Sequence, residues 1–247
     1  MINIKSPREI ELMRVAGKIV AELFVELDRL IKPGVTTLEL DQAAYAFIKK
    51  NKAEPAFLGY GGFPATLCTS VNEVLIHSIP DRTALKEGDI VSIDVGAVYG
   101  GYYSDAARTY PVGNISEEAK RLLEVTEQSF REALKFTKAY NHLGDICAAI
   151  GDYLQLRGYS VPQDYTGHGV GRELHEAPAI PNYGIKGSGV RLKSGMVLAI
   201  EPMVLSGSDK TKVAADNWAV SSVDKSLTAH YENTVLVKDD GYEILTA

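Results

Sequence analysis

The stretch GDIVSIDVGAVYGGYYSDAART, residues 88–109, has the pattern of a β-hairpin. An apolar run leads to the pair Gly100-Gly101, and a second strand-like run returns after it. A Gly-Gly pair favours a two-residue turn, which places Tyr99 opposite Tyr102 and fixes the register of both strands. The architecture of this part of the chain is therefore predicted from one short segment.

Two aspartates interrupt this hairpin, one on each side of the turn. In the predicted register Gly96 lies opposite Asp105, and because side chains alternate between the faces of a strand, Asp94, Gly96 and Asp105 share one face. Ile93 and Val95 point the other way, into a core. The two carboxylates are then diagonal neighbours, about 7–8 Å apart at the backbone. A solvent-facing polar edge would explain them, and so would a divalent cation, for which the glycine between them leaves room.

The composition is that of an ordinary globular protein. The 247 residues carry a formal net charge of −6 and the pI is about 5.5. This charge argues against nucleic acid or an anionic membrane as the main partner, because both bind basic surfaces more tightly. Cys68 and Cys147 are too few for a disulfide scaffold and are expected to be reduced thiols. The sequence shows no signal-peptide pattern and no apolar run of bilayer-spanning length, so we expect a cytoplasmic protein with no membrane partner.

A repeat divides the chain into two similar halves, roughly residues 1–112 and 113–247. The segment LKEGDIVSID (85–94) resembles LKSGMVLAIE (192–201), and it places Asp94 and Glu201 at equivalent positions. Each copy follows a pair of segments with helical periodicity. The predicted helices span residues 6–30, 38–52, 115–138 and 143–158. No linker-like stretch separates the halves, so we expect one α+β domain over residues 1–247 in which each half delivers a carboxylate at the end of a strand.

Further metal-ligand types follow in the second half. His168 lies between glycines in the run TGHGVGRELHEAP, and Glu201 and Glu232 lie among apolar residues, where a lone glutamate is uncommon without a partner. Together with Asp94 and Asp105 they supply four carboxylates and one imidazole. Two divalent ions would balance the four charges, and this donor set suits Mn, Fe(II), Co or Zn. Two such ions about 3.5–4 Å apart form a hydrolytic centre.

Five segments match, in order and spacing, the motifs of the bacterial type I methionine aminopeptidases, which the chain resembles over essentially its whole length. The segments are SVNEVLIHSIP, GDIVSIDVGAVYGGYYSDAART, YTGHGVGRELHEAP, GMVLAIEPMV and AHYENTVLV. The resemblance implies the pita-bread fold, whose pseudo-twofold halves each pack helices on a curved antiparallel sheet. It also implies a dinuclear metallo-exopeptidase that removes the N-terminal methionine from nascent proteins and peptides when the second residue is small.

The resemblance assigns a role to each metal ligand. Asp94 binds one ion in bidentate fashion, Asp105 and Glu232 bridge both ions, and His168 and Glu201 hold the other.

Catalytic and substrate-binding roles follow in the same way. His77 contacts the scissile amide nitrogen, His175 stabilises the carbonyl oxygen, and Glu201 transfers the proton. The residues implied to line the methionine side-chain pocket are Tyr60, Phe63, Cys68, Leu174 and Trp218, with Phe57 as a further wall. Those implied for a nearby monovalent cation are Asn72, Val74 and Thr228.

Three positions depart from the family pattern. Ser78 stands where glycine is usual after the histidine, and His230 and Asn233 flank Glu232 where glutamine and histidine are common. None belongs to the ligand set above, so we expect them to tune the metal preference and not to change the reaction.

Two other functions remain open from the sequence. A proline-specific peptidase would share the metal ligands, but that group usually has a separate N-terminal domain, and here the first helix is predicted from residue 6. A metal-free binding protein on the same fold would be expected to have lost ligands, and all are present. The family's partners are nascent polypeptide N-termini and, by implication, the ribosome; we expect a monomer that does not read nucleic-acid sequence directly.

Overall fold

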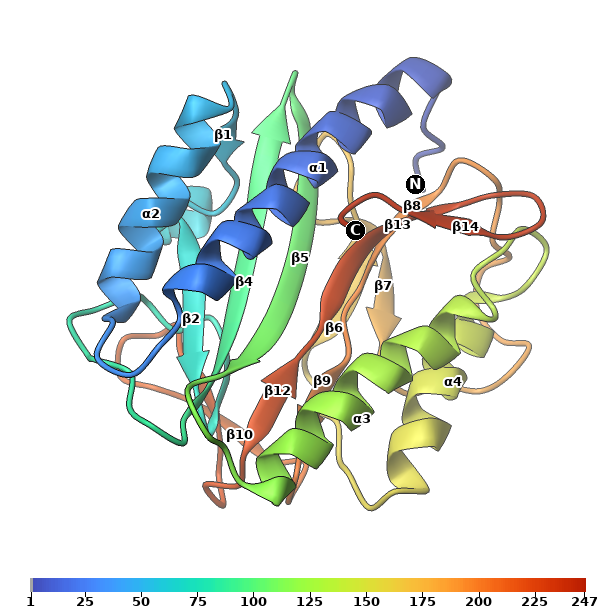
Figure 1. Ribbon diagram of the computed structural model, residues 1–247. Coiled ribbons are helices and arrows are strands. Elements are labelled where there is room, and N and C mark those ends of the chain that lie inside the picture. The colour runs from blue at the N-terminus through green and yellow to red at the C-terminus, as the bar shows by residue number, and fades with distance from the viewer. Residues whose placement is uncertain (1) are drawn as a thin grey trace.

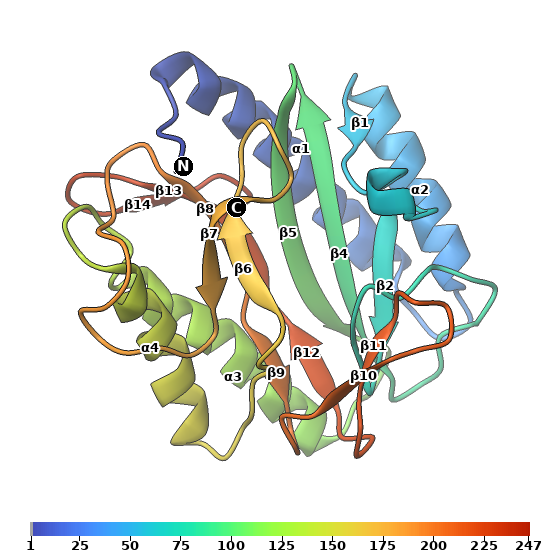
Figure 2. The ribbon, with the colours of Figure 1, turned by 180° about the vertical axis from the view of Figure 1, so that it is seen from behind.

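The computed structural model describes residues 2–247. A long curved sheet runs across the molecule, and all the described α-helices cover one of its faces, as comparison of Figures 1 and 2 shows. The predicted α+β pita-bread architecture is confirmed. None of the described helices is long and apolar enough to cross a membrane.

The first half of the chain begins with two helices and ends with the hairpin. Its elements are α1 (Pro7–Leu30), α2 (Thr37–Lys50), β1 (Glu54–Pro55), the 3-10 helix η1 (Tyr60–Gly62), β2 (Leu67–Val71), β3 (Val74–Ile76), β4 (Ile90–Tyr99) and β5 (Tyr102–Pro111). The predicted helices over 6–30 and 38–52 match α1 and α2 to within two residues at each end.

The second half repeats the order of two helices followed by strands. Its elements are α3 (Glu117–Leu134), α4 (Leu143–Gln155), β6 (Thr166–Gly169), β7 (Glu176–Pro181), β8 (Val197–Ile200), β9 (Met203–Leu205), β10 (Thr211–Val213), β11 (Val220–Ser222), β12 (Thr228–His230), β13 (Glu232–Val237) and β14 (Tyr242–Ile244). Helices α3 and α4 end a few residues before the predicted limits.

The large sheet joins strands of both halves. Its strand order is β1-β4-β5-β13-β8-β6-β7, with β2 on β4 and β14 on β13, and every described pairing is antiparallel. Strands β5 and β13 meet at its centre, where Glu232 pairs with Ala107. Residues far apart in the sequence therefore lie side by side at the junction of the halves.

The hairpin has the predicted two-residue turn and register. Gly100 and Gly101 have φ of 59° and 81°, which favour glycine, and Tyr99 pairs with Tyr102. Gly96 lies opposite Asp105, as predicted. One face of β4 thus points apolar side chains at α1 and α2, and the other face presents the aspartates.

The internal repeat is visible in the backbone hydrogen bonds. Gly88 donates to the carbonyl of Val112 at 2.9 Å, and the equivalent Gly195 donates to that of Val237 at 3.0 Å. Both glycines have a positive φ, of 93° and 88°. The similarity between the two ten-residue segments therefore corresponds to the same turn conformation in both halves. In each half the turn precedes a strand that leads to a carboxylate.

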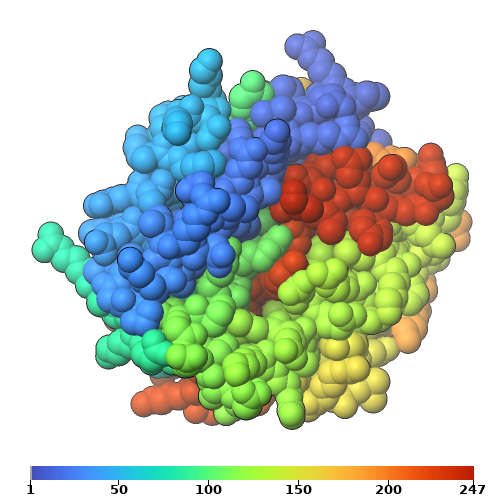
Figure 3. Space-filling view, viewed as in Figure 1, coloured from blue at the N-terminus to red at the C-terminus, as the bar shows by residue number. Residues whose placement is uncertain are grey.

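The helical layer closes the back of the sheet. Helices α1 and α2 pack on the first-half strands, and α3 and α4 pack on β8 and β13 around buried side chains such as Leu122 and Phe130. Figure 3 shows the C-terminal segment lying between α1 and α3 on this face. The carbonyl of Leu245 packs so closely on Gly17 of α1 that any side chain there would collide with it.

The space beside Gly96 differs from the sequence-based expectation. An added Cβ at this glycine would lie 2.7 Å from the Cβ of Ala56 and 2.7 Å from the carbonyl oxygen of Ser104. The ring of Phe57 is also only 3.2 Å away. The glycine thus admits the segment after β1 and not a cation, because β1 pairs with β4 at Ala97 and Val98 and brings Ala56 and Phe57 onto Gly96.

We predict that Gly96→Ala destabilises the protein, because Ala56 and the Ser104 backbone would have to move. Overpacking of this kind costs about 1–3 kcal/mol, which for a chain of this size lowers Tm by several degrees. Gly241→Ala is the matched control, since a Cβ at that position meets no atom within 4 Å. Thermal unfolding of both variants tests this, and equal Tm values would contradict the close packing at Gly96.

Candidate metal centre and substrate pocket

Five strand segments converge on the sheet face opposite the helices, each bringing one of the predicted ligands. Asp94 lies on β4, Asp105 on β5, His168 on β6, Glu201 directly after β8, and Glu232 at the start of β13. One ligand atom each from Asp105, His168 and Glu232 lie within 4.8 Å of one another. The structure therefore brings together residues from positions 94 to 232 in one small volume.

Several buried oxygen atoms in this cluster lack a partner. Asp94 Oδ1, Asp105 Oδ1 and Glu232 Oε1 accept no hydrogen bond from any residue between 2 and 247. A buried polar atom without a partner costs about 1–3 kcal/mol, and more if it is charged. Carboxylates in this state fit bound cations, which would satisfy the free oxygens.

Burial and mutual repulsion shift the pKa of each carboxyl group in the cluster. Burial raises the pKa of Asp94 to about 7, and the charge of Glu201 adds to the rise. Burial raises the pKa of Asp105 well above its ordinary value, with the charge of Asp94 as the next cause. Burial has the same effect on Glu201 and Glu232. Without cations these groups favour their protonated forms.

His168 is oriented as a ligand. Its Nδ1 lies 2.9 Å from the carbonyl oxygen of Gly169, which can only accept, so Nδ1 carries the proton and Nε2 has a free lone pair. That Nε2 lies 3.5 Å from Glu201 Oε1 and 3.7 Å from Asp105 Oδ2. Burial lowers the pKa of His168 to about 3, which keeps the imidazole neutral.

A pocket adjoins the cluster and is lined by every side chain predicted for the methionine site. The lining residues are Phe57, Tyr60, Phe63, Cys68, His77, Leu174, His175 and Trp218, together with the five ligands. Phe63 and Trp218 meet edge to face with ring centroids 5.1 Å apart. The result is a largely apolar pocket with charged groups at one side, as is typical of small-ligand sites.

His77 has an unusual backbone conformation. Its φ is 62°, a region that residues with a side chain adopt rarely and at a cost of about 1–3 kcal/mol. Burial lowers the pKa of its imidazole to about 4, so the ring is neutral at pH 7. A half-buried, neutral histidine held in a strained conformation beside the cluster is unusual for a purely structural residue.

His175 also lines the pocket. Its Nδ1 lies 2.8 Å from the Tyr60 hydroxyl, and its ring centroid lies 4.3 Å from that of His168. Burial lowers the pKa of His175. Tyr60, expected only as a pocket wall, therefore also orients a histidine next to the cluster.

The predicted monovalent-cation residues also meet. The Thr228 hydroxyl lies 2.9 Å from the carbonyl oxygens of both Asn72 and Val74 and can donate to either one, and Asn72 has a φ of 53°. This geometry gathers two main-chain oxygens, from the turn between β2 and β3 and from the start of β3, beside a hydroxyl oxygen of β12.

The three departures from the family pattern have different surroundings. Asn233 is buried and accepts from Arg108 Nη2 at 2.7 Å and from the Thr246 hydroxyl at 2.9 Å. The main-chain carbonyl of Ser78 accepts from Thr69 N at 2.9 Å. His230, by contrast, lies inside the cluster, and one ligand atom each from Asp94, His230 and Glu232 lie within 4.8 Å of one another.

Two residues near the centre were not foreseen in these positions. His230 was noted only as a departure, although its spacing of two from Glu232 could have indicated the same face. Arg108 donates to the main-chain carbonyl of Glu232 at 2.5 Å and lies over the ring of Tyr231 at 4.3 Å. Nothing in the sequence around Arg108 indicates this contact, because it joins the two halves.

Comparison with known proteins agrees with this geometry. Residues 11–239 match metallopeptidase family M24. A methionine aminopeptidase of Clostridium acetobutylicum is 53% identical over 247 residues, with 100% of this chain and 99% of that protein covered. The crystal structure of methionine aminopeptidase from Thermotoga maritima superimposes with a TM-score of 0.98 at 48% identity, covering 100% of this chain and 99% of that one.

A more distant structure bears on the alternative function. The prolidase from Pyrococcus furiosus superimposes with a TM-score of 0.79 at 27% identity, and the match covers 99% of this chain but 65% of the prolidase. The chain therefore has the same fold as the prolidase but matches only part of its length. It matches the methionine aminopeptidases over almost their whole length. It belongs to metallopeptidase family M24 and, within it, to the bacterial-type methionine aminopeptidases.

Proposed function

We propose that the protein removes the N-terminal methionine from nascent proteins and peptides whose second residue is small. The observation that carries this proposal is the apolar pocket directly beside the carboxylate cluster. A flexible thioether side chain can fill an apolar pocket, while the adjacent peptide bond lies over the polar side. Metal-dependent hydrolysis is the activity that this family and this donor set share.

Two divalent ions fit the cluster. We propose that Asp94, Asp105, His168, Glu201 and Glu232 hold them. Three of these residues supply free buried oxygens, His168 supplies a free imidazole nitrogen, and Glu201 Oε1 lies 3.5 Å from that nitrogen. Bound divalent ions activate water and polarise the substrate carbonyl. Cobalt, manganese, iron(II) and zinc all suit one imidazole with several carboxylates, and the donor types alone do not select among them.

The protein's own residues bind the substrate and move the proton. Glu201 accepts the proton of the attacking water and passes it to the leaving amine. If the Tyr60 hydroxyl donates to Nδ1 of His175, the histidine keeps its proton on Nε2 and can donate to the developing oxyanion. His77 orients the scissile amide from the other side of the pocket.

The wider setting is inferred from the resemblance. We propose a single catalytic domain with halves of roughly residues 1–112 and 113–247, acting as a cytoplasmic monomer on chains at or near the ribosome. A monovalent cation bound by the carbonyls of Asn72 and Val74 would support the loops that position His77. Co-sedimentation with ribosomes and light scattering test the association and the oligomeric state.

We predict that chelator-treated protein does not hydrolyse Met-Ala-Ser and that re-addition of a single divalent metal restores turnover. The reason is that the cluster has no other means of activating water at neutral pH. A Xaa-Pro dipeptide assayed in parallel is the control for the proline-specific alternative. Preferred hydrolysis of that dipeptide would replace the proposed substrate, and full activity after metal removal would exclude a metallopeptidase.

We predict that Glu201→Gln and His77→Ala both lower kcat. Removal of a proton-transfer group typically lowers the rate by about 10²–10⁴-fold, so the kcat of Glu201→Gln should be at least about 100-fold below that of the wild type. Metal content measured on the same samples separates loss of proton transfer from loss of an ion. Glu22→Gln, on the exposed side of α1, is the matched control. Undiminished kcat in His77→Ala would show that His77 is only a core residue.

We predict that metal-free Asp105→Asn is more stable than the metal-free wild type, by a margin that grows from pH 4.5 to pH 7.5. Burial raises the pKa of Asp105 in the folded state above its ordinary value of 3.8. As pH rises above 3.8, the carboxyl group ionises first in the unfolded state. The unfolded state is thereby favoured, and the wild type loses stability. Asparagine cannot ionise and avoids this loss. Thermal unfolding in chelator at several pH values measures the difference.

Glu9→Gln is the control of opposite sign. A hydrogen bond from Tyr102 is the largest cause that lowers the pKa of Glu9 to about 2, so its stabilisation is fully present above 4.5 and lost as pH falls toward 2. Glu9→Gln should therefore lower Tm by a constant amount between pH 4.5 and 7.5. A pH-independent margin for Asp105→Asn would mean that Asp105 is not buried without a cation.

A further inference from the structure

We propose that His230 is a sixth ligand of the metal centre, binding through Nε2 the ion held by Asp94 and Glu232. The inference rests on the metal centre of the proposed function and extends it. Each of the two ions would then have one imidazole ligand, His168 for one and His230 for the other.

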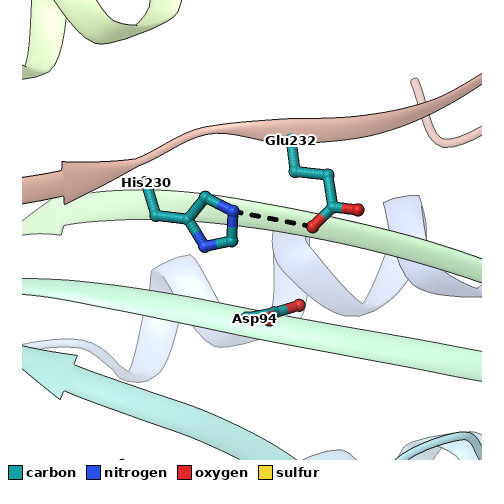
Figure 4. A group of neighbouring side chains, drawn as sticks. All are labelled: Asp94, His230 and Glu232. Atoms are coloured by element: carbon teal, nitrogen blue, oxygen red, sulfur yellow. Dashed lines mark ion pairs between the residues drawn. The ribbon is translucent and has the colours of Figure 1, made fainter. Parts of the chain in front are cut away.

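The strand direction points His230 into the centre. His230 ends β12 and Glu232 begins β13, so the two residues are separated by one position and their side chains share a face. Tyr231 between them points the other way, toward Phe130, at a centroid distance of 5.4 Å. Figure 4 shows His230 and Glu232 projecting toward Asp94 on β4.

The distances around His230 repeat those around His168. His168 Nε2 lies 3.5 and 3.7 Å from oxygens of Glu201 and Asp105. His230 Nε2 lies 3.5 Å from Glu201 Oε2 and 3.8 Å from Glu232 Oε2. These separations exceed the usual hydrogen-bond range of about 2.7–3.2 Å. The 3.8 Å between His230 Nε2 and Glu232 Oε2 matches two donors on one ion, because bonds of about 2.0–2.2 Å place neighbouring donors about 3–4 Å apart.

Nε2 of His230 has no other use in the described part of the chain. The side chain is 2% exposed, and this nitrogen makes no hydrogen bond to any residue between 2 and 247. A buried nitrogen aimed at carboxylate oxygens, yet too far from them to bond, needs a partner between them. A divalent cation is the partner that also satisfies the free Asp94 Oδ1 and Glu232 Oε1.

The internal repeat gives an independent argument. The offset of 107 residues that relates Asp94 to Glu201 also relates Gly96 to Met203. Gly96 pairs with Asp105 in the first half, and Met203 pairs with His230 in the second. His230 therefore occupies the position equivalent to Asp105, which is itself one of the proposed ligands.

The backbone holds His230 in this position. Its N–H donates to Thr109 Oγ1 at 2.9 Å, and the same hydroxyl donates to the His230 carbonyl at 2.9 Å. These bonds tie β12 to β5, so the imidazole cannot withdraw without disturbing the junction of the halves. A ligand fixed in this way is preorganised.

An added imidazole changes which ion the centre prefers. Imidazole suits cobalt and zinc, whereas manganese prefers oxygen donors. In a His230→Gln variant an amide replaces this aromatic nitrogen. We therefore expect this chain to favour cobalt or zinc over manganese more strongly than its own His230→Gln variant does.

The direct test is a crystal structure of the wild-type protein loaded with Co(II), with the ions located by anomalous scattering. We expect His230 Nε2 about 2.0–2.2 Å from the ion nearest Asp94. A separation above about 3 Å, with cobalt bound by the other five residues, would overturn the sixth ligand and leave the proposed function standing. Failure to bind any of cobalt, manganese, iron(II) and zinc would overturn both.

Calorimetric titration of His230→Gln provides the second test. Glutamine keeps a hydrogen-bond donor but is a poor ligand for cobalt, and even partners one layer beyond the ligands are worth about 10–100-fold in metal affinity. We expect Co(II) affinity to fall by at least tenfold and Mn(II) affinity to fall less. His142→Gln, at the start of α4, is the matched control and should bind as the wild type does. Unchanged Co(II) affinity in a folded His230→Gln variant would overturn the sixth ligand.

Discussion

Four carboxyl groups of like charge are held close together in this fold at an electrostatic cost. Asp94, Asp105, Glu201 and Glu232 face one another from strands that cannot move apart, and burial raises the pKa of each. The free energy that offsets this arrangement comes from the other side of the sheet, where apolar side chains pack under the helices. The chain thus uses a stable helical layer to hold a polar cluster that is favourable only when cations bind.

The duplicated unit explains how the cluster is assembled from separate parts of the sequence. Each half starts a strand from the same glycine turn and delivers a carboxylate at the end of it, Asp94 in one half and Glu201 in the other. The central strands then bring the copies together at the pairing of Glu232 with Ala107. The halves have diverged at equivalent positions, since Asp105 of the first half corresponds to His230 of the second, and the two sides of the cluster are therefore chemically unequal.

The pocket beside the cluster is built mostly from segments outside the repeated unit. Phe57, Tyr60 and Phe63 lie on the loop between β1 and β2, and Trp218 lies on the loop before β11. Loops can differ between the halves without disturbing the strands, so one half supplies most of the walls. The pocket loop packs directly on the strand that carries Asp94. Because Gly96 has no side chain, Ala56 and Phe57 of this loop can lie against it. The loops thus supply the pocket for the substrate side chain, and the strands supply the carboxylate cluster beside it.

The hairpin register, the four helices, the repeat and the five candidate ligand positions could all be predicted from the sequence, because turn chemistry and side-chain periodicity are local properties. Length and motif order were enough to indicate the family. What fills the space at Gly96, how Tyr60 meets His175, and where Arg108 and His230 lie depended instead on the packing of the folded chain. Those contacts join residues more than a hundred positions apart, as between Tyr60 and His175 or Arg108 and Glu232. No local pattern specifies such pairs, since their distances follow from the packing of one half against the other.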